Sequence, residues 1–156
     1  INLLSKACGK NGMVFGQYLD IENENNQSID IKKLDDIHNL KTGKLIECAV
    51  MLGQIGSSLE SESLNALRDF SSKIGLAFQI TDDILDVTQI ESILGKNKNS
   101  DAKNNKLTYI DIIGLGEAKL KANKLTDLAL NSLNQSNITN IDKLIEMAKY
   151  LIGRES

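Results

Sequence analysis

The amino-acid sequence predicts an all-α fold, and three of its features support this expectation. None of the 156 residues is proline, the residue that most strongly interrupts a helix. Apolar residues recur at spacings of three and four in several long segments, which is the period of a helix with one buried face. No segment shows a sustained alternation of apolar and polar residues, the pattern of a half-buried strand. A chain of this length suits one domain, built from helices that pack on each other.

The first two segments are expected to be helical. Apolar side chains recur at mixed spacings of three and four over residues 1–22 and again over residues 30–56, where Asp30 is the expected N-cap. Glycine inside a helix weakens it by about 1 kcal/mol relative to alanine. Gly16 in the first helix and Gly43 in the second are therefore expected to allow close approach of another helix or a ligand.

The rest of the chain is expected to contain three further helices. They are predicted over residues 61–88, 107–133 and 140–152. Gly114 and Gly116 are expected to break or kink the second of them. Residues 91–106 are polar and rich in lysine and asparagine, so they are predicted to form a loop.

Composition narrows the classes of function. Hydrophobic residues make up 41% and charged residues 25%, which is ordinary for a globular protein. The net charge of −3 argues against a nucleic-acid partner, which usually requires a basic excess. No apolar run approaches the roughly 20 residues of a membrane span. Cys8 and Cys48 have no zinc-like or disulfide-framework spacing, so we expect reduced thiols in a cytoplasmic protein.

An acidic cluster in the helix predicted over residues 61–88 is the strongest indication of chemistry. Positions i, i+3, i+4 and i+7 of a helix share one face, because the helix advances about 100° per residue. Here they are occupied by Gln79, Asp82, Asp83 and Asp86. Two carboxylates about 5 Å apart repel by roughly 3 kcal/mol at the effective dielectric of a protein site, and a cation would reverse that sign. Such a face suits Mg²⁺ bound together with a diphosphate. The alternative is a solvated acidic face, although the flanking apolar residues indicate partial burial.

Lysines in two other segments could bind the anion that accompanies such an ion. Lys41 could serve as a point charge for a phosphate, with the Thr42 hydroxyl as a donor. Lys96 and Lys106 lie in the predicted loop after the aspartates, from which they could face the same anion. Each lysine alone is better explained as a solvated charge. Together with the aspartates, they suit a polyphosphate substrate.

Other polar residues are uninformative by themselves. Gln17 and Asp20 are compatible with an ordinary polar helix face. His38 is the only histidine and is expected at the surface or at its boundary. No second histidine or paired cysteine supports a zinc site or a catalytic triad, and there is no P-loop or GxGxxG motif.

Taken together, these segments resemble the trans-prenyl diphosphate synthases. Residues 78–86 (FQITDDILD) resemble the second aspartate-rich motif of that family. The resemblance continues in residues 16–20 (GQYLD), 38–43 (HNLKTG) and 94–96 (LGK), and in Asp101, Lys106, Thr108 and Tyr109. The spacings between the segments also fit, so the combination is far more specific than any one motif. Within the family, these residues most resemble those of the bacterial farnesyl diphosphate synthases.

The resemblance implies an isoprenoid synthase fold, a helical bundle around a deep cavity, usually as a homodimer. It implies Mg²⁺-dependent condensation of an allylic diphosphate (dimethylallyl or geranyl) with isopentenyl diphosphate. The allylic diphosphate ionises, the isopentenyl double bond attacks the carbocation, and a proton is lost.

The resemblance also implies roles for individual residues. Asp82, Asp83 and Asp86 match metal-binding positions, with Asp82 expected to bind the ion directly. The catalytic and substrate-binding positions that contact the allylic diphosphate or shield the carbocation are matched by Lys41, Thr42, Gln79 and Lys96. Lys106 matches a further diphosphate-binding lysine. Gln17 and Asp20 match residues that line the same cavity.

The resemblance covers nearly the whole chain but only the C-terminal half of the family fold. The family's first aspartate-rich motif and its basic pocket for isopentenyl diphosphate have no counterpart in residues 1–156. We therefore expect these residues to be the C-terminal half of a polyprenyl synthase domain and to be inactive alone. Two alternatives stay open, a geranylgeranyl or longer-chain synthase and a non-catalytic helical subunit or truncated homologue.

Overall fold

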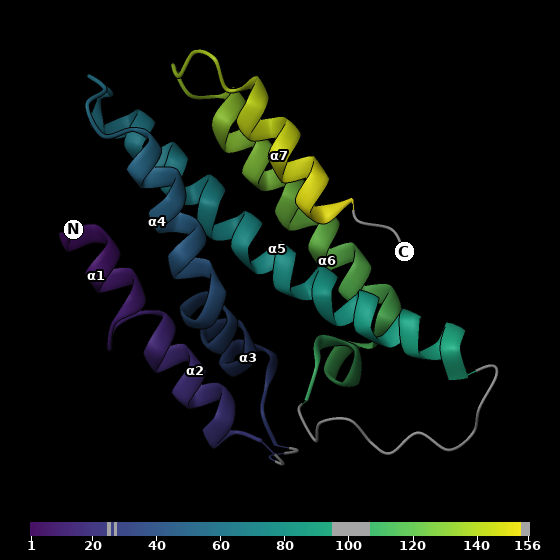
Figure 1. Ribbon diagram of the computed structural model, residues 1–156. Helices are drawn as coiled ribbons and strands as arrows, with labels where there is room; N and C mark the ends of the chain where they lie inside the picture. Colours follow the sequence, from purple (N-terminus) through teal and green to yellow (C-terminus); the bar gives the residue numbers. More distant parts are fainter. Residues whose placement is uncertain (25, 27, 95–106, 154–156) are drawn as a thin grey trace.

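The computed structural model of the chain is a bundle of helices and confirms the all-α expectation (Figure 1). It describes residues 1–24, 26, 28–94 and 107–153. No β-strand occurs in these ranges. The elements are, in chain order, α1 (Asn2–Cys8), α2 (Met13–Glu22), α3 (Ile31–His38), the π-helical turn η1 (Asn39–Gly43), α4 (Lys44–Gly53), α5 (Ser61–Leu94), α6 (Tyr109–Asn134) and α7 (Asp142–Ile152). Within the described ranges, no helix is both long enough and apolar enough to cross a membrane.

The two longest helices, α5 and α6, pack along each other at the centre of the bundle (Figure 1). α7 lies beside α6, and α1 to α4 lie on the other side of α5. One cluster of buried side chains, which includes Phe70 and Leu133, joins α5, α6 and α7. A second cluster, which includes Leu34, Ile80 and Tyr109, joins α3, α5 and α6. This second cluster involves the turns of α5 that carry the aspartates, so it supports the candidate site.

The helix predicted over residues 1–22 is two helices, so the prediction of one continuous helix is wrong. α1 stops before Gly9, whose backbone N–H donates to the carbonyl oxygen of Ser5 at 3.0 Å. α2 starts after Gly12. A Cβ at Gly12 would lie 2.0 Å from the carbonyl oxygen of Ala7, so only glycine fits where the connection passes the end of α1.

The helix predicted over residues 30–56 contains a π turn that was not predicted. Its start is confirmed, because the Asp30 carboxylate accepts a hydrogen bond from the N–H of Lys33 at 2.7 Å. The chain then passes from α3 through η1 into α4 without a break. α4 ends at Gly53 rather than near Gly56, whose φ of +92° forms a turn. A π turn accommodates one extra residue within an α-helix and is frequent at functional sites.

α5 is longer than predicted. It continues to Leu94, so residues 91–94 are helical and their assignment to a loop is wrong. Neither proline nor glycine occurs between Thr88 and Gly95 to end the helix earlier. The rest of the predicted loop, residues 95–106, lies outside the described residues.

α6 begins and bends as its sequence indicates. The Thr108 hydroxyl and the Asp111 carboxylate form a capping box at its start. Gly114 has φ 79° and ψ 158°, which confirms the predicted kink, whereas Gly116 stays helical. The kink separates the first turn of α6, which begins with Tyr109, from the longer part that packs along α5 (Figure 1).

Candidate functional site

Glycines hold the π turn η1 between α2 and α5. A Cβ at Gly16 of α2 would lie 2.2 Å from the backbone nitrogen of Lys41 and 2.6 Å from the carbonyl carbon of Leu40. On the other side, a Cβ at Gly75 of α5 would lie 2.9 Å from the Cα of Gly43. The expectation that Gly16 and Gly43 allow close approach of another helix is therefore confirmed. Backbone contact on both sides fixes the position of the π turn.

This packing brings two predicted site residues together. Lys41 Nζ lies 2.8 Å from Oδ2 of Asp20, an ion pair between η1 and α2. The side chain of Asp20 is 11% exposed and that of Lys41 is 29% exposed, so the pair is partly withdrawn from water and its attraction is stronger than at the surface. Gln17 of α2 and Thr42 of η1 are half-buried on the same two contacting elements.

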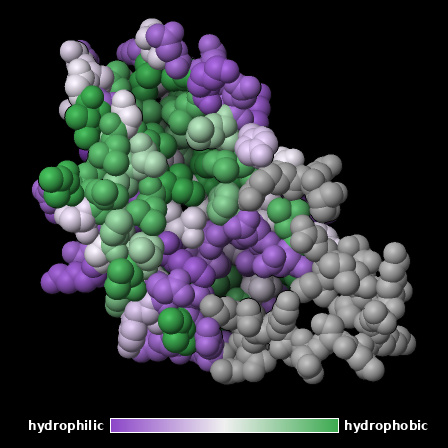
Figure 2. Space-filling view, in the orientation of Figure 1, coloured by the Kyte–Doolittle hydropathy of each residue, from purple (hydrophilic) through white to green (hydrophobic). Residues whose placement is uncertain are grey.

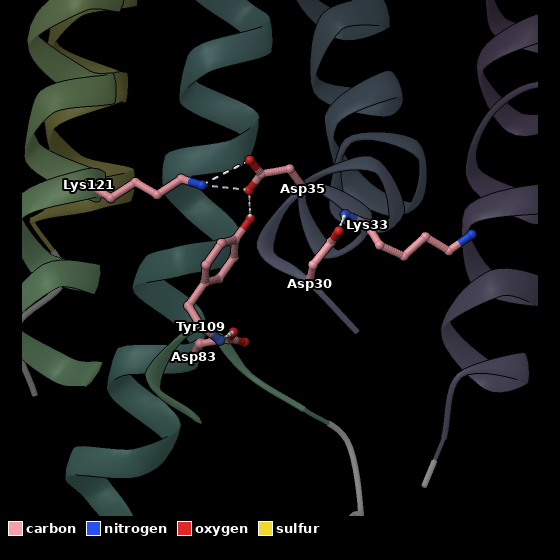
Figure 3. A network of polar contacts seen from close by, with 6 residues as sticks. All are labelled: Asp30, Lys33, Asp35, Asp83, Tyr109 and Lys121. Atoms are coloured by element: carbon pink, nitrogen blue, oxygen red, sulfur yellow. Dashed lines mark hydrogen bonds and ion pairs between the residues drawn. The ribbon is translucent and has the colours of Figure 1, made fainter. Parts of the chain in front are cut away.

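The aspartates of α5 have different surroundings. Asp82 accepts a hydrogen bond from Nε2 of Gln79 at 3.3 Å. Asp83 is half-buried and accepts the backbone N–H of Tyr109 at 3.0 Å (Figure 3). Asp86 is exposed. The face therefore presents carboxylates at different depths rather than one uniform acidic surface.

The donor set of this face fits a hard cation. Burial raises the pKa of Asp83 to about 6, the Tyr109 N–H opposes the shift, and neighbouring carboxylates add to it. A cation beside the face would offset this unfavourable environment for the ionised form. The described part of the chain contains no group of three or more ligands close enough together to hold an ion. The face therefore fits an ion that takes its remaining ligands from elsewhere, and metal binding by Asp82, Asp83 and Asp86 stays a prediction.

Two of the predicted site lysines cannot be placed. Lys96 and Lys106 lie outside the described residues. Two clefts elsewhere, of about 260 and 670 Å³, are lined by none of the predicted site residues. The larger one lies between the end of α4 and α7. The candidate site is therefore defined by its charges, not by these clefts.

His38 lies inside the bundle, so its expected place at the surface or boundary is wrong. It is 7% exposed, and its ring stacks on that of Tyr109 with centroids 5.5 Å apart. Neither ring nitrogen has a hydrogen-bond partner within the described residues. Burial lowers the pKa of His38 to about 4; the charge of Lys41 lowers it too, while Asp20 and Gln79 act in the opposite direction. Gln79 lies close to the ring but outside hydrogen-bonding geometry. His38 thus lies among residues of α2, η1 and α5.

His38 and Asp83 are expected to make opposite contributions to the pH dependence of stability. The pKa of His38 is lowered from 6.5 to about 4. As pH falls from 6.5 to 4, the unfolded chain therefore binds a proton at this histidine before the folded chain does, and stability is lost. The pKa of Asp83 is raised from 3.8 to about 6. Over pH 6 to 4 the folded chain therefore binds the proton first, and stability is gained.

Single substitutions should separate the two contributions. We expect His38→Gln to make stability rise relative to the wild-type chain as pH falls from 6.5 to 4, and Asp83→Asn to make it fall. Each change should be on the order of 2 to 3 kcal/mol, from pKa shifts of about two units. Urea denaturation of both variants between pH 4 and 7 measures this. Parallel pH profiles for the two variants would contradict it.

Beside the aspartate face lies a polar network that the sequence analysis missed (Figure 3). The Tyr109 hydroxyl donates to Oδ1 of Asp35, and Lys121 Nζ lies 2.7 and 2.9 Å from the two oxygens of Asp35. The paired residues are 74 and 86 positions apart, and the periodicity of single helices carries no sign of such pairs. The sequence did offer one signal. Tyr109 directly follows the capping residue Thr108, and a tyrosine hydroxyl buried at that position would need a hydrogen-bond partner.

Exposed apolar side chains gather on α1 and α2. They are Leu3, Leu4, Val14, Phe15, Tyr18 and Ile21. Figure 2 shows hydrophobic side chains concentrated over the side of the molecule formed by α1, α2 and α4. Exposed apolar surface of this kind is typical of an interaction site.

Comparison with known proteins identifies the family of the chain. The sequence profile of the polyprenyl synthetase family matches residues 1–148. The chain is 39% identical over 157 residues to a farnesyl diphosphate synthase of Micrococcus luteus, covering 99% of the chain and 52% of that relative. It is 35% identical to a chloroplastic geranylgeranyl pyrophosphate synthase of Catharanthus roseus, covering 98% of the chain and 43% of that relative.

A solved structure gives the same result for the fold. It is the crystal structure of a geranyltransferase from Helicobacter pylori complexed with magnesium and isoprenyl diphosphate, which matches with a TM-score of 0.69 and 31% identity. The match covers 97% of this chain and 48% of that one. The chain therefore has the helical fold of the isoprenyl diphosphate synthases, as the resemblance implied.

The chain belongs to the polyprenyl synthetase family. It spans about half the length of the curated relatives that it matches.

Proposed function

We propose that the intact protein carrying this chain is a Mg²⁺-dependent prenyltransferase that condenses dimethylallyl or geranyl diphosphate with isopentenyl diphosphate to give farnesyl diphosphate. The observation that carries the proposal is the arrangement around His38. Lys41 and Asp20, which form an ion pair, and Gln79 of the aspartate face all lie near enough to its ring to shift its pKa. A cation site and an anion-binding lysine on adjacent elements suit a metal-bound diphosphate.

Each group has a separate task in this proposal. Lys41 and Thr42 bind the allylic diphosphate, and Asp20 keeps the Lys41 side chain directed into the site. Asp82, Asp83 and Asp86 bind the metal, with Gln79 holding the carboxylate of Asp82. Mg²⁺, when bound, would neutralise charge on the departing diphosphate. Lys96, Lys106 and Gln17 complete the diphosphate and cavity contacts that the family resemblance implies.

The product chain length has a second candidate. The 35% identity to a geranylgeranyl pyrophosphate synthase supports a longer product as well. Incubation of the intact protein with Mg²⁺, isopentenyl diphosphate and geranyl diphosphate, followed by chromatography of the products, separates the two. A C15 product supports the farnesyl proposal, and C20 or longer products contradict it.

Asp82→Ala in the intact protein is expected to lower kcat by about a hundredfold or more, because one metal carboxylate is lost from the place where charge develops. Asp127→Ala is the matched control, because Asp127 is an exposed helical aspartate of α6 remote in sequence from this face, and it should leave kcat unchanged. Equal activity of the two variants would favour a non-catalytic helical subunit instead. The 156 residues alone are expected to give no product in the same assay.

The remaining proposals concern association and location. We expect a homodimer, and the exposed apolar side chains of α1 and α2 support burial of this side against further polypeptide. Light scattering on the intact protein measures its mass in solution. We also expect a cytoplasmic protein.

A further inference from the structure

Tyr109 is anchored at both of its ends, to two different helices (Figure 3). Its backbone N–H donates to Oδ2 of Asp83 on α5 at 3.0 Å. Its hydroxyl donates to Oδ1 of Asp35 on α3. The residue is fully buried, with 0% of its surface exposed. One residue, through its backbone and its side chain, therefore links α3 to the aspartate face.

The anchor on α3 is itself held by a third element. Lys121, from the part of α6 beyond the Gly114 kink, binds both oxygens of Asp35 at 2.7 and 2.9 Å. Its ammonium group also lies 5.0 Å from the centroid of the Tyr109 ring, within the range of a cation–π contact. The first turn of α6 is thus tied to the main part of the same helix through Asp35, across the kink at Gly114.

The ring of Tyr109 also contacts the end of α3, which leads into the π turn η1. His38, the last residue of α3, stacks on it with centroids 5.5 Å apart. The π turn that carries Lys41 begins at the next residue. The placement of Tyr109 is therefore coupled to both the aspartate face and the diphosphate-binding segment.

The hydrogen bond donated by the Tyr109 N–H fixes the direction of the Asp83 carboxylate. Within the described residues, the structure shows no other hydrogen bond to this carboxylate. Hydrogen-bond partners of this kind orient metal-binding carboxylates, and their loss typically lowers metal affinity about 10- to 100-fold.

We propose that Tyr109, held in place by Asp35 and Lys121, is a positioning residue that orients the Asp83 carboxylate for metal binding. The proposal rests on the proposed function of the aspartate face. It assigns to the Asp35–Tyr109–Lys121 network a role in ion binding beyond its part in the core.

The test uses Tyr109→Phe in the intact protein, because this change keeps the ring and the backbone N–H but removes the hydroxyl anchor. Lys121→Met removes the ammonium group that holds Asp35 in place. Tyr150→Phe and Lys143→Met are matched controls, since Tyr150 is 74% exposed and Lys143 pairs with Glu146 on the surface of α7. Binding of Mn²⁺, as a substitute for Mg²⁺, is titrated by electron paramagnetic resonance, and thermal unfolding is measured in parallel without metal.

Tyr109→Phe is expected to raise the Mn²⁺ dissociation constant of the affected site about tenfold. This is the lower end of the range for loss of a residue that orients a metal-binding carboxylate. Lys121→Met should raise it in the same direction, and both controls should match the wild-type protein. A lower melting temperature with an unchanged dissociation constant would show a purely structural role and overturn the proposal.

Asp82→Ala separates failure of this inference from failure of the proposed function. If Asp82→Ala weakens Mn²⁺ binding and Tyr109→Phe does not, the positioning role is wrong and the function stands. If neither variant weakens it, the aspartate face is not a metal site and both proposals fail.

Discussion

Gly16→Ala is expected to destabilise the chain by about 3 kcal/mol or more, the upper end for an overpacked site. The added Cβ would lie 2.2 Å from the backbone nitrogen of Lys41 and 2.6 Å from the carbonyl carbon of Leu40. Both are backbone atoms, so no side-chain rotation can relieve the clash. The π turn would have to move away from α2, and the Lys41–Asp20 ion pair would be stretched with it. Urea denaturation gives the free energy of unfolding.

Gly116→Ala provides the control for this substitution. Gly116 lies within α6, and a Cβ there would meet no heavy atom within 4 Å. The exchange should stabilise the chain by about 0.5 to 1 kcal/mol, because alanine is the better helix former. Gly16→Ala and Gly116→Ala thus have opposite expected signs. A stabilising effect at Gly16 would disprove the close approach of α2 to the π turn.

Lys41→Ala in the intact protein is expected to lower kcat/KM for the allylic diphosphate by roughly two to three orders of magnitude, through loss of a positioned charge at the diphosphate. Asp20→Asn keeps the lysine charge but removes the ion pair at 2.8 Å that directs it. Its effect should therefore be smaller than that of Lys41→Ala.

Lys44→Ala is the matched control for Lys41→Ala. Lys44 follows the π turn, its side chain is 44% exposed, and it pairs with Glu47 on its own helix. Its removal should change kcat/KM little, because the charge of Lys44 is already paired with Glu47 and such an exposed pair contributes only a few tenths of a kcal/mol to stability. Equal losses for the two lysines would refute a specific role for Lys41.

The sequence predicted those features that follow from the period of a single helix. The shared face of Asp82, Asp83 and Asp86 is one, because the spacing of residues within a helix fixes it. The Asp30 cap and the Gly114 kink are others, since each depends on the local preference of one residue type. The proximity of Lys41 to Asp20 was indicated only by the family resemblance.

The features that the sequence did not predict depend on contacts between distant segments. The π turn is held by Gly16 and Gly75, which come from two other helices, and no residue within η1 marks it. His38 was expected at the surface or at its boundary, yet a stack on Tyr109 and packing among other elements bury it. The Asp35–Lys121 pair joins residues 86 positions apart, which helical periodicity cannot register.

The π turn also determines where the length of this segment can vary. Because the turn holds one residue more than an ordinary helix would, deleting one residue from Asn39–Gly43 would let α3 and α4 join as a regular α-helix with α4 in nearly the same orientation. Cys48 and Met51, which are 2% and 4% exposed, would then still face the core. A one-residue deletion within the regular turns of α4 would instead rotate the residues after it by about 100°. The π turn is therefore the place in this segment where losing one residue should disturb the core least.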